Sequence, residues 1–531
     1  MRAAPAALAA AAFLLAHAQT PPATLSVVVN VTVPQSRLAA PYLNFNLDIG
    51  SIYNGFDWRD PVLINLVYPL SNDGVIIRVG GTAADYAFYQ PAAASPQGAA
   101  AGETLYSAAL LDDLFYFAAQ TGANLLFDFN GLAFRPVPNA DGTLGPWDPT
   151  GNATAMLGYL NAKYGGAVRW SWSLGNEPDL WTEKVNMTTL GHDALALGKV
   201  LAGYRLGTDV YGPSLSGLAV APVQEFLQAT GGNVAGVTVH NYPLGRDCNV
   251  SAYLDRSVVD RLGGELAALV AARDAMGHRN TPLVLEEVAG CYGGGCENIT
   301  DRFVDGFFYL SMLGAVAASG FSRVHRQDVA GWSFTGGKSH YQLAGPPGWT
   351  NGSTLLTPHP DWYTSVLFKQ LIANTLLNTT VTGDAAALAQ VSVHAWCSGA
   401  AWWDDESMVL SWTNPTGADV TLDVVIPDTP AAPRMEFTLT SSAAGYSESH
   451  ARVAAGRAAT MASPLAPPAS LTDDALFLNG ARLQADENGV LPWVNGAVGA
   501  GRVVTDPSEP IIMPPFSYGF IQLPGSAPHA C

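Results

Sequence analysis

Two short stretches of the 531-residue chain place carboxylates where an apolar run stops. "WSLGNEPDL" carries Asn176 and Glu177 directly before a proline, and "PLVLEEV" carries Glu286 and Glu287. Two carboxyl groups that face each other suit hydrolysis of a glycosidic bond, because one protonates the departing oxygen while the other attacks the anomeric carbon or activates water. The first must hold its proton and the second must stay ionised, so their surroundings have to differ.

These carboxylates need a frame that brings distant segments together. From residue 41 to about 375, β-branched runs alternate with longer helical patterns, which is typical of a parallel sheet covered by helices. Eight strands are expected, at 42–48, 74–81, 124–131, 169–176, 208–213, 236–242, 282–288 and 321–329. Eight such strands close a (β/α)8 TIM barrel. A doubly wound open sheet fits the same alternation, and the polar residues at the strand ends must decide between the two.

Polar side chains end several of the expected strands. They are Asp48, Asn176 with Glu177, His240 with Tyr242, Glu286 with Glu287, and Gln327. Reactive groups of a (β/α)8 barrel sit at the C-terminal ends of the strands, so the carboxylates of the fourth and seventh strands should face each other. Because side chains alternate along a strand, only one of Glu286 and Glu287 is expected to point into the mouth. Hydrogen bonds from His240, Tyr242 or Arg326 are expected to keep the nucleophile ionised.

The pattern changes after about residue 380 to short alternating strands between Pro, Gly and Asp turns, which is typical of an antiparallel β-sandwich. The alternating stretch at 24–36 is expected to join it. The fold class is therefore predicted as α/β, a barrel with an additional C-terminal sandwich. The catalytic barrel is expected at 41–375, and the β-sandwich domain at 24–36 plus 380–531.

The first eighteen residues, "MRAAPAALAAAAFLLAHA", read as a cleavable secretory signal peptide at 1–18. A membrane anchor is the alternative, but the apolar run is short for a bilayer. Seven Asn-x-Ser/Thr sequons agree with a secreted glycoprotein, either outside the cell or in a lysosome-like compartment. Five cysteines leave at least one thiol unpaired, and any two of Cys248, Cys291 and Cys296 can pair.

The formal net charge is −19, with 44 acidic against 25 basic residues and no cluster of lysine or arginine. Such a field repels polyanions, so nucleic acid is not expected as a partner and a heavily sulfated polymer is an awkward substrate. No obligatory protein partner is expected, and the sequence leaves peripheral association with a membrane open.

Eight segments together give the chain a family resemblance. They are "RVGGTAADY", "WSLGNEPDL", "VTVHNYPLGR", "LEEVAGCYGGG", "HRQ", "HYQLAG", "PHPDWYTSVLFKQLI" and "PPFSYGFIQLPGSAPHAC". In order and spacing they resemble glycoside hydrolase family 79, the family of heparanase and related β-glucuronidases. The resemblance runs from about residue 42 to the end of the printed sequence.

The resemblance implies a role for each matched residue. Glu177 matches the acid/base and Glu287 the nucleophile, with Glu286 facing away. Other positions would bind substrate: Asn176 the sugar's 2-hydroxyl, Tyr242 the nucleophile or sugar, Gly293, Gly294 and Tyr341 the glucuronate carboxylate, and Asp48, Thr82, His240 and Gln327 the rest of the glycone. Cys397 and Cys531 match a disulfide of the terminal domain. The resemblance implies neither a metal nor an organic cofactor.

Two departures narrow the expected substrate. The heparanase branch has a long excised linker where this chain has a short loop at 90–103, and basic heparin-binding segments are missing. We therefore expect an unprocessed, secreted, retaining β-glucuronidase that acts on less charged glucuronides. An endo-acting heparanase that cleaves heparan-sulfate-like polymers is one alternative. A catalytically inactive carbohydrate-binding barrel is an alternative of another class.

Overall fold

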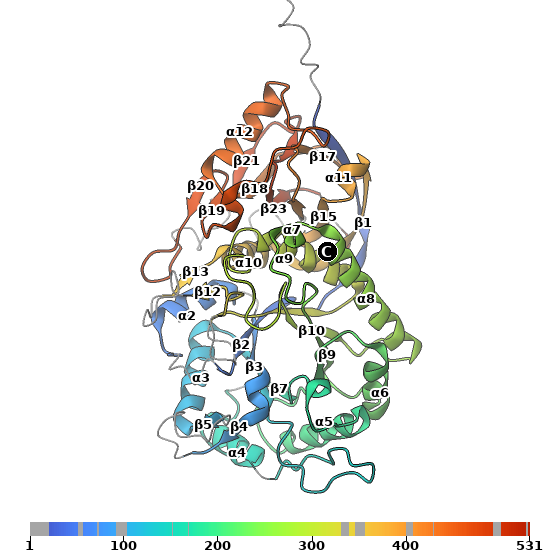
Figure 1. Ribbon diagram of the computed structural model, residues 1–531, viewed down its shortest axis with the longest axis vertical. Coiled ribbons are helices and arrows are strands. Elements are labelled where there is room, and N and C mark those ends of the chain that lie inside the picture. The colour runs from blue at the N-terminus through green and yellow to red at the C-terminus, as the bar shows by residue number, and fades with distance from the viewer. Residues whose placement is uncertain are drawn as a thin grey trace, which may run out of the picture.

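Eight parallel strands form a nearly closed barrel in the lower half of the molecule (Figure 1). The structure, a computed structural model, describes residues 21–50, 57–71, 74–91, 104–150, 152–167, 169–330, 339–345, 356–399, 407–427, 429–491, 501–526 and 529–531. The signal peptide expected at 1–18 and most of the loop at 90–103 lie outside these residues.

Each barrel strand falls largely within one of the eight ranges expected from the sequence. The strands are β2 (Leu43–Asp48), β3 (Ile76–Gly80), β6 (Asn124–Phe129), β7 (Ser171–Leu174), β8 (Tyr211–Leu215), β9 (Gly236–Asn241), β10 (Leu283–Val288) and β11 (Arg323–Arg326). Their order in the sheet is β7-β6-β3-β2-β11-β10-β9-β8. Hydrogen-bonded neighbours are consecutive barrel strands along the chain, except that the first and the last, β2 and β11, pair with each other. A parallel bridge between Trp172 and Val210 brings the two end strands together. This sequential, nearly closed order confirms a barrel and excludes the doubly wound alternative.

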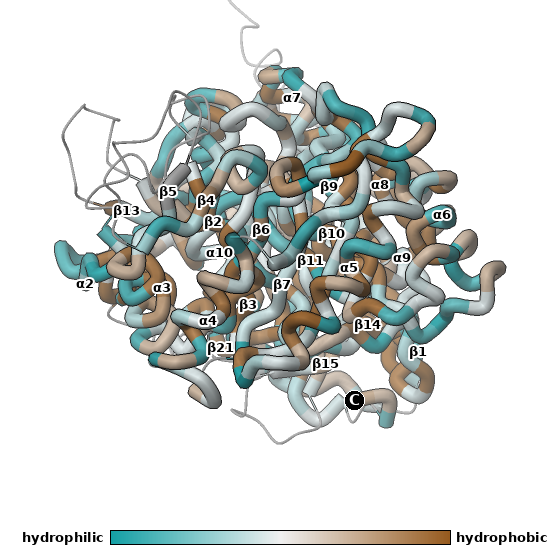
Figure 2. The backbone as a smooth tube through the Cα atoms, turned by 90° about the horizontal axis from the view of Figure 1, so that it is seen from below, coloured by the Kyte–Doolittle hydropathy of each residue, from teal (hydrophilic) through white to brown (hydrophobic). Residues whose placement is uncertain are grey.

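Helices surround the barrel strands. The helices are α2 (Pro61–Val67), α3 (Ala108–Thr121), α4 (Asn152–Tyr164), α5 (Met187–Leu201), α6 (Val220–Thr230), α7 (Val250–Tyr253), α8 (Arg256–Ala275), α9 (Asp305–Ser319) and α10 (Pro360–Leu371). Helices α11 (Ala385–Leu388) and α12 (Ala443–Ala454) lie instead in the upper half of the molecule in Figure 1. Figure 2, seen from below, shows α3, α6 and α8 outside the strands. Strands β2, β3 and β10 are buried along their whole length, because helices cover the outer face while side chains fill the interior.

Local sequence explains where several helices begin and end. Helix α3 begins after Ser107, whose side chain accepts a hydrogen bond from the backbone N–H of Leu110. It ends at Gly122, which has a φ of 74° and so adopts the left-handed conformation that a helix C-terminus often requires. Gly320 ends α9 in the same way, with a φ of 91°.

A second sheet forms the upper half of the molecule in Figure 1. Its strands are β1 (Ala23–Arg37), β14 (Ile372–Gly383), β15 (Ser392–Ser398), β16 (Met408–Asn414), β17 (Val420–Val425), β18 (Arg434–Thr440), β19 (Leu476–Leu478), β20 (Ala481–Leu483), β21 (Arg502–Val504), β22 (Ile511–Met513) and β23 (Ser517–Leu523). Two small pairs lie apart from both sheets, β4 (Ala87–Tyr89) with β5 (Thr104–Tyr106) and β12 (Ala344–Gly345) with β13 (Thr357–Pro358).

The first strand of the described chain lies inside this second sheet. Strand β1 pairs antiparallel with β14 and parallel with β17. The sheet is one continuous ladder of strands, and its division into the two packed layers of a sandwich stays a prediction. Strand β14 begins at Ile372, within the range expected for the barrel. Helix α9 joins the two halves, since it packs against α8 on one side and against β16 on the other.

Two disulfides hold loops and ends together. Cys397 is bonded to Cys531, the pairing that the resemblance implied. Of the three cysteines left open by the sequence, Cys248 pairs with Cys296, and Cys291 is a buried free thiol.

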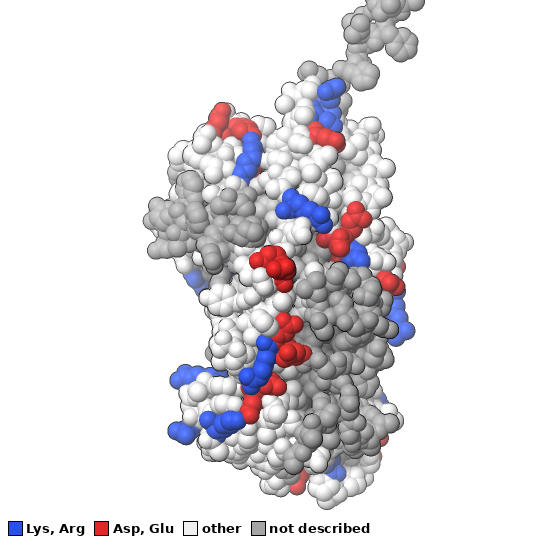
Figure 3. Space-filling view, turned by 90° about the vertical axis from the view of Figure 1, so that its left-hand side faces the viewer, with Lys and Arg blue, Asp and Glu red and all other residues white. Residues whose placement is uncertain are grey.

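Figure 3 shows how charged side chains are distributed over one face of the molecule. On the face shown in Figure 3, lysine and arginine side chains lie singly or in small groups, often near acidic ones, with wide uncharged areas between them. Among the residues described, this face has no continuous basic track. None of the helices in the described part of the chain has the combined length and hydropathy of a membrane-spanning segment.

Candidate active site

A cavity of about 480 Å³ opens at the C-terminal ends of the barrel strands. It is lined by Asp48, Gly81, Thr82, Glu177, Leu180, Ser216, Tyr242, Glu287, Tyr292, Gly293, Gly294, Gln327 and Tyr341. All but two of the residues expected to catalyse or bind substrate are in this lining. The two exceptions, Asn176 and His240, are buried behind it. The structure therefore brings the expected residues together at one place.

Glu177 reaches the cavity because the chain turns sharply after β7. Glu177 itself has a φ of 48°, a left-handed conformation that is uncommon for a residue other than glycine. Its backbone N–H donates to the carbonyl of Ser214 at 2.9 Å, and the short helix Pro178–Leu180 follows at once. Asp85 secures the turn by accepting hydrogen bonds from the Asn176 backbone N–H and the Trp181 indole N–H. The strained backbone of Glu177 is thus held by the surrounding hydrogen bonds, and it directs the Glu177 side chain into the cavity.

Glu287 lies on β10 and is held by two donors. Arg78 Nη1 donates to its Oε2 at 2.8 Å, and the Tyr242 hydroxyl donates to its Oε1. Burial raises the pKa of this carboxyl, but the positive charges of His240 and Arg78 and the hydrogen bonds from Tyr242 and Arg78 outweigh it, so the pKa lies below its usual range. Glu287 is therefore held ionised, as a nucleophile requires.

Arg78, rather than Arg326, is the arginine beside Glu287. Its guanidinium is 1% exposed and also contacts Asn176 Oδ1 at 2.8 Å and Asp128 Oδ2 at 3.1 Å. Arg326 instead pairs with two aspartates elsewhere in the interior and does not hold the nucleophile. The sequence offered one signal that pointed to Arg78, namely a charged residue in the middle of an apolar barrel strand, which needs a buried partner.

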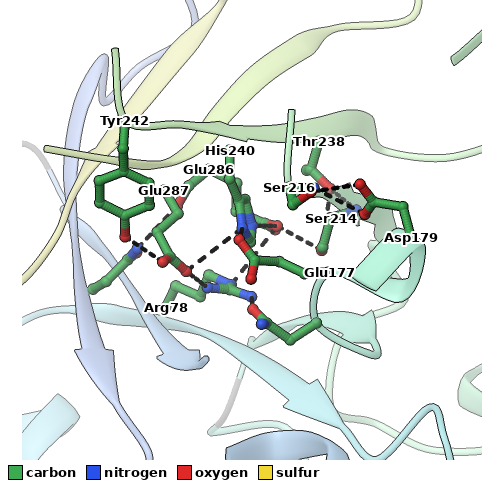
Figure 4. A network of polar contacts seen from close by, with 12 residues as sticks. Arg78, Glu177, Asp179, Ser214, Ser216, Thr238, His240, Tyr242, Glu286 and Glu287 are labelled. Carbon is green, nitrogen blue, oxygen red and sulfur yellow. Dashed lines mark hydrogen bonds and ion pairs between the residues drawn. The ribbon is translucent and has the colours of Figure 1, made fainter. Parts of the chain in front are cut away.

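Glu286 is expected to face away from the site, and of the two glutamates only Glu287 is part of the cavity lining. Glu286 is buried behind the lining, where it contacts other polar groups of the barrel. In the register of β10 with β9, Leu285 pairs with Val239 and Glu287 pairs with His240, so Glu286 is an extra residue in a β-bulge. The bulge interrupts the alternation of a regular strand. Glu287 lines the cavity, whereas Glu286 lies beside His240 behind it (Figure 4). Glu286 Oε2 accepts a hydrogen bond from Ser214 Oγ at 2.6 Å.

His240 lies between the carboxylates. Its Nδ1 is 3.1 Å from Glu177 Oε1 and 3.7 Å from Glu287 Oε2, and its Nε2 is 3.3 Å from Glu286 Oε2 (Figure 4). Burial lowers the pKa of His240, but these carboxylates outweigh burial and the nearby Arg78 charge, and they raise the pKa to about 10. The ring is therefore an imidazolium at neutral pH and donates to Glu177 on one side and to Glu286 on the other.

Other residues of the cavity lining carry groups that can bind a sugar. Burial, together with the charge of Glu287, raises the pKa of Asp48 to about 7. Tyr341 stacks on Tyr242 with ring centroids 6.3 Å apart. Gly293 has a φ of 72°, so its turn adopts a backbone conformation that favours glycine.

Glu177, His240 and Glu287 each offer a ligand atom, and these atoms lie within 4.8 Å of one another. The same atoms contact each other, Tyr242 and Arg78, and the guanidinium places a fixed positive charge beside them. We interpret the cluster as a hydrogen-bonded acid–base site rather than a metal site. The distance between the carboxyl groups of Glu177 and Glu287 decides the chemistry. When two carboxyl groups are about 5–5.5 Å apart, one can attack the anomeric carbon while the other protonates the glycosidic oxygen.

The chain is similar in sequence to known carbohydrate-active proteins. A model of the N-terminal domain of glycosyl hydrolase family 79 matches residues 40–314, just over half of the chain. Heparanase of Rattus norvegicus is 29% identical over 301 residues, which cover 54% of this chain and 51% of that protein. Hyaluronoglucuronidase of Hirudo nipponia is 28% identical over 277 residues, which cover 51% of this chain and 53% of that one. Inactive heparanase-2 of Homo sapiens is 29% identical over 292 residues, 52% of this chain and 44% of that protein.

The chain thus spans about half the length of the curated relatives it matches. Solved structures match over more of it. A 4-O-α-L-rhamnosyl-β-D-glucuronidase from Fusarium oxysporum has a TM-score of 0.60 at 13% identity, covering 94% of this chain and 100% of that one. An α-L-arabinofuranosidase from Thermotoga maritima has a TM-score of 0.59 at 14% identity, covering 94% of this chain and 99% of that one. At these identities the likeness shows the fold alone.

Proposed function

The chain belongs to glycosyl hydrolase family 79, and on that premise we propose that it is a retaining β-glucuronidase with Glu287 as nucleophile and Glu177 as acid/base. One observation carries the proposal: an oxygen of Glu177 lies within 4.8 Å of an oxygen of Glu287. This separation suits the retaining route, since inverting enzymes keep their carboxyl groups about 6.5–9.5 Å apart to admit a water.

The reaction proceeds in two displacements. Glu287, ionised by Arg78 and Tyr242, attacks the anomeric carbon while Glu177 protonates the leaving oxygen. Water then enters, Glu177 takes one of its protons, and the bond between the sugar and Glu287 breaks. Arg78 and Tyr242 stabilise the carboxylate again as it leaves.

Three residues of the cavity lining are proposed to recognise the carboxylate of the glucuronate. Gly293, Gly294 and Tyr341 would hold its carboxylate through backbone N–H groups and a phenol, which need no basic cluster. Six other residues would contact the sugar hydroxyls. Four of them line the cavity, namely Asp48, Thr82, Tyr242 and Gln327. The other two, Asn176 and His240, are buried behind the lining.

The aglycone is proposed to be weakly charged. The described lining of the cavity includes no lysine or arginine. At the opening, Leu180 is 65% exposed and Tyr292 is 44% exposed, and both offer apolar surface to a leaving group. Arg246 lies over the ring of Tyr292 at 5.1 Å and is a cation beside this opening, but it is not part of the lining itself. An aryl or alkyl glucuronide can pack against the exposed surfaces of Leu180 and Tyr292.

An endo-acting heparanase is the second candidate, and relatives named heparanase and hyaluronoglucuronidase favour it. Aryl β-glucuronides and heparan sulfate, assayed side by side, separate the two. We expect hydrolysis of the aryl glucuronide and no shortening of the polymer. Shortening of the polymer with the aryl glucuronide left intact would replace our proposal with the endo-acting one.

A carbohydrate-binding barrel without catalysis is a third candidate, because inactive heparanase-2 is among the relatives. The presence of both carboxylates argues against it. A 2-fluoro-glucuronyl fluoride, which traps the covalent intermediate, is the direct test. Peptide mapping should find the label on Glu287; a label on Glu286 would reassign the nucleophile, and an active enzyme that is never labelled would argue against the covalent route.

Passage through a secretory pathway is also part of the proposal. The two disulfides support it, since disulfides persist mainly in oxidising compartments. Expression with residues 1–18 in a eukaryotic secretion system, followed by sequencing of the mature N-terminus, tests it. Retention of residues 1–18 in the exported protein would contradict a cleavable signal.

A further inference from the structure

Glu286 is a third carboxylate at this site, and the two-displacement scheme gives it no role. Its side chain is fully buried and is not part of the cavity lining, so it does not touch substrate. It contacts three elements of the barrel: Ser214 Oγ at 2.6 Å on β8, His240 Nε2 at 3.3 Å on β9, and Arg78 Nε at 3.7 Å on β3. Burying a carboxylate inside the barrel carries a desolvation penalty, so a function for Glu286 has to be sought in the groups that it contacts.

The groups around Glu286 keep it ionised. Burial raises its pKa, but the charges of Arg78 and His240 and the hydrogen bonds from His240 and Ser214 outweigh burial and lower the pKa to about 2. Further out, Asp128 lies beyond Arg78, and Tyr211 and His325 also feel its charge. Burial lowers the pKa of His325 to about 3, so that ring is neutral. Glu286 therefore carries its negative charge across the working range of a glycosidase.

That charge faces the imidazole on the side away from substrate. The groups that act on His240 are Glu177, Glu286, Glu287 and Arg78, with Asp128 behind the guanidinium. Of the three carboxylates, Glu177 and Glu287 change their charge or their bonding during catalysis. Glu286 alone stays constant, so it supplies a permanent partner for Nε2 and leaves Nδ1–H directed at Glu177.

We propose that Glu286 is a positioning residue that keeps His240 charged and aimed, so that His240 stores the proton that Glu177 passes to the leaving group. This inference rests on the proposed function. In the first displacement the Nδ1–H bond breaks and an O–H bond forms on Glu177. That O–H bond breaks as the leaving oxygen takes the proton together with the electron pair of the glycosidic bond, while Glu287 bonds to the anomeric carbon.

In the second displacement the proton returns. The oxygen of a water bonds to the anomeric carbon, and the electron pair of the bond to Glu287 goes back to that carboxylate. Glu177 takes a proton from the water and passes it to Nδ1. No other reactant is needed, and His240 ends the cycle as it began, an imidazolium between Glu177 and Glu286.

The first test needs no substrate. In protein labelled with ¹³C at the histidine Cε1 positions, the resonance of His240 is assigned by its loss in His240→Asn. In the wild-type protein this ring should stay protonated up to pH 9. In Glu286→Gln, which keeps the shape and removes the charge, its titration should move down by at least about one pH unit. A wild-type His240 that titrates near pH 6.5, or a titration unmoved in Glu286→Gln, would overturn the proposal.

The second test follows the proton through catalysis. A phenyl glucuronide needs its leaving oxygen protonated, whereas a 4-nitrophenyl glucuronide needs this far less. Glu286→Gln should move the alkaline limb of kcat/KM to lower pH and cut the rate at pH 7 about tenfold for the first substrate and no more than about threefold for the second. Glu286→Asp, which restores the charge, should recover much of the lost rate. Equal losses on both substrates at every pH would mean a merely structural role and would overturn the proposal.

Asp128→Asn is the matched control, since it removes another buried charge from the Arg78 network but has no hydrogen bond to the ring in the described contacts. It should move the alkaline limb less than Glu286→Gln does, and an equal shift would count against a specific role for Glu286. A wild-type protein that hydrolyses no glucuronide overturns the proposed function and the delivery step with it. The titration of His240 still decides whether Glu286 sets the charge of the ring.

Discussion

Arg78 and Glu287 form a buried ion pair, with Nη1 of the guanidinium 2.8 Å from Oε2 of the carboxylate and the arginine side chain 1% exposed. The same guanidinium reaches Asp128 and Glu286, so one cation compensates several carboxylates within the barrel. A network of this kind is sensitive to the loss of its centre, because each carboxylate left behind is buried without a partner.

Replacing Arg78 with methionine should therefore damage both stability and catalysis. We expect the free energy of unfolding to fall by about 3–5 kcal/mol and kcat to fall by at least about 100-fold. The pKa of Glu287 should rise, so the acid limb of the pH–rate profile should move to higher pH. Urea titration measures the free energy of unfolding, and the pH–rate profile measures kcat and the position of the acid limb. Arg59→Met is the control, because Arg59 forms an exposed ion pair whose loss should change the free energy of unfolding little.

Tyr242→Phe isolates one hydrogen bond to the nucleophile. Its hydroxyl donates to Glu287 Oε1 and helps to keep the pKa of that carboxyl low. Without it, the pKa of Glu287 should rise, the acid limb should move to higher pH, and kcat should fall about 10- to 100-fold. Unchanged stability in thermal melts would show that the ring still packs. An acid limb that stays in place would mean that the hydroxyl serves the sugar instead.

Glu177 and Glu287 should differ in how external azide rescues their alanine variants. In Glu177→Ala, azide attacks the intermediate on the face that water uses and should give a β-glucuronyl azide. In Glu287→Ala, azide takes the place of the nucleophile and should give the α-azide. Proton NMR of the products distinguishes them. Glu265→Ala, an exposed change on α8, should leave turnover unaltered; azide products of the opposite anomers would exchange the two assigned roles.

Asp328 should make stability fall as pH rises. Burial and the charge of Asp48 raise its pKa to about 8, far above its value in the unfolded chain. The folded protein thus holds a proton that the unfolded chain releases near pH 4, and the stability this gives is lost between about pH 4 and 8. Asp328→Asn should reduce the loss between pH 5 and 8 by about 1–4 kcal/mol. Urea titrations at both pH values test this, and parallel curves for the two proteins would refute it.

The disulfide between Cys397 and Cys531 closes a loop with a sequence separation of 134. Replacing both cysteines with serine should lower the free energy of unfolding by about 2–4 kcal/mol, chiefly by loosening the unfolded chain. The KM for an aryl glucuronide should stay within about twofold of the wild-type value, because neither residue lines the cavity. Cys291→Ser, which breaks no disulfide, is the control. A changed KM would mean that the second sheet shapes the site.

Much of the barrel and its site follows from local sequence. The eight strands, the glycine ends of α3 and α9, and the gathering of Glu177, Tyr242 and Gln327 at one mouth all come from alternation, helix caps and polar strand ends. Alternation, helix caps and polar strand ends each depend on residues close together in the chain, so they can be recognised in one sequence.

The remaining features depend on contacts between distant segments. The bulge at Glu286 exists only in the register between β10 and β9, so the contacts of Glu286 with Ser214 and His240 could not be predicted from alternation along β10. Arg78 and Arg326 are both buried arginines on barrel strands, and only the positions of the surrounding carboxylates decide which one serves the nucleophile. The choice of Cys248 over Cys291 as the partner of Cys296 likewise depends on loop geometry.

Strand β1 has a consequence for the order in which this protein folds. It lies between β14 and β17, segments that are synthesised only after the whole barrel. During synthesis neither neighbour of β1 is present, so β1 stays unpaired while the barrel strands pair with one another. The second sheet is then completed around β1 only when the chain is nearly finished. Fragments that divide the chain between the barrel and the second sheet would leave β1 unpaired on one side of the cut and an open gap in the sheet on the other.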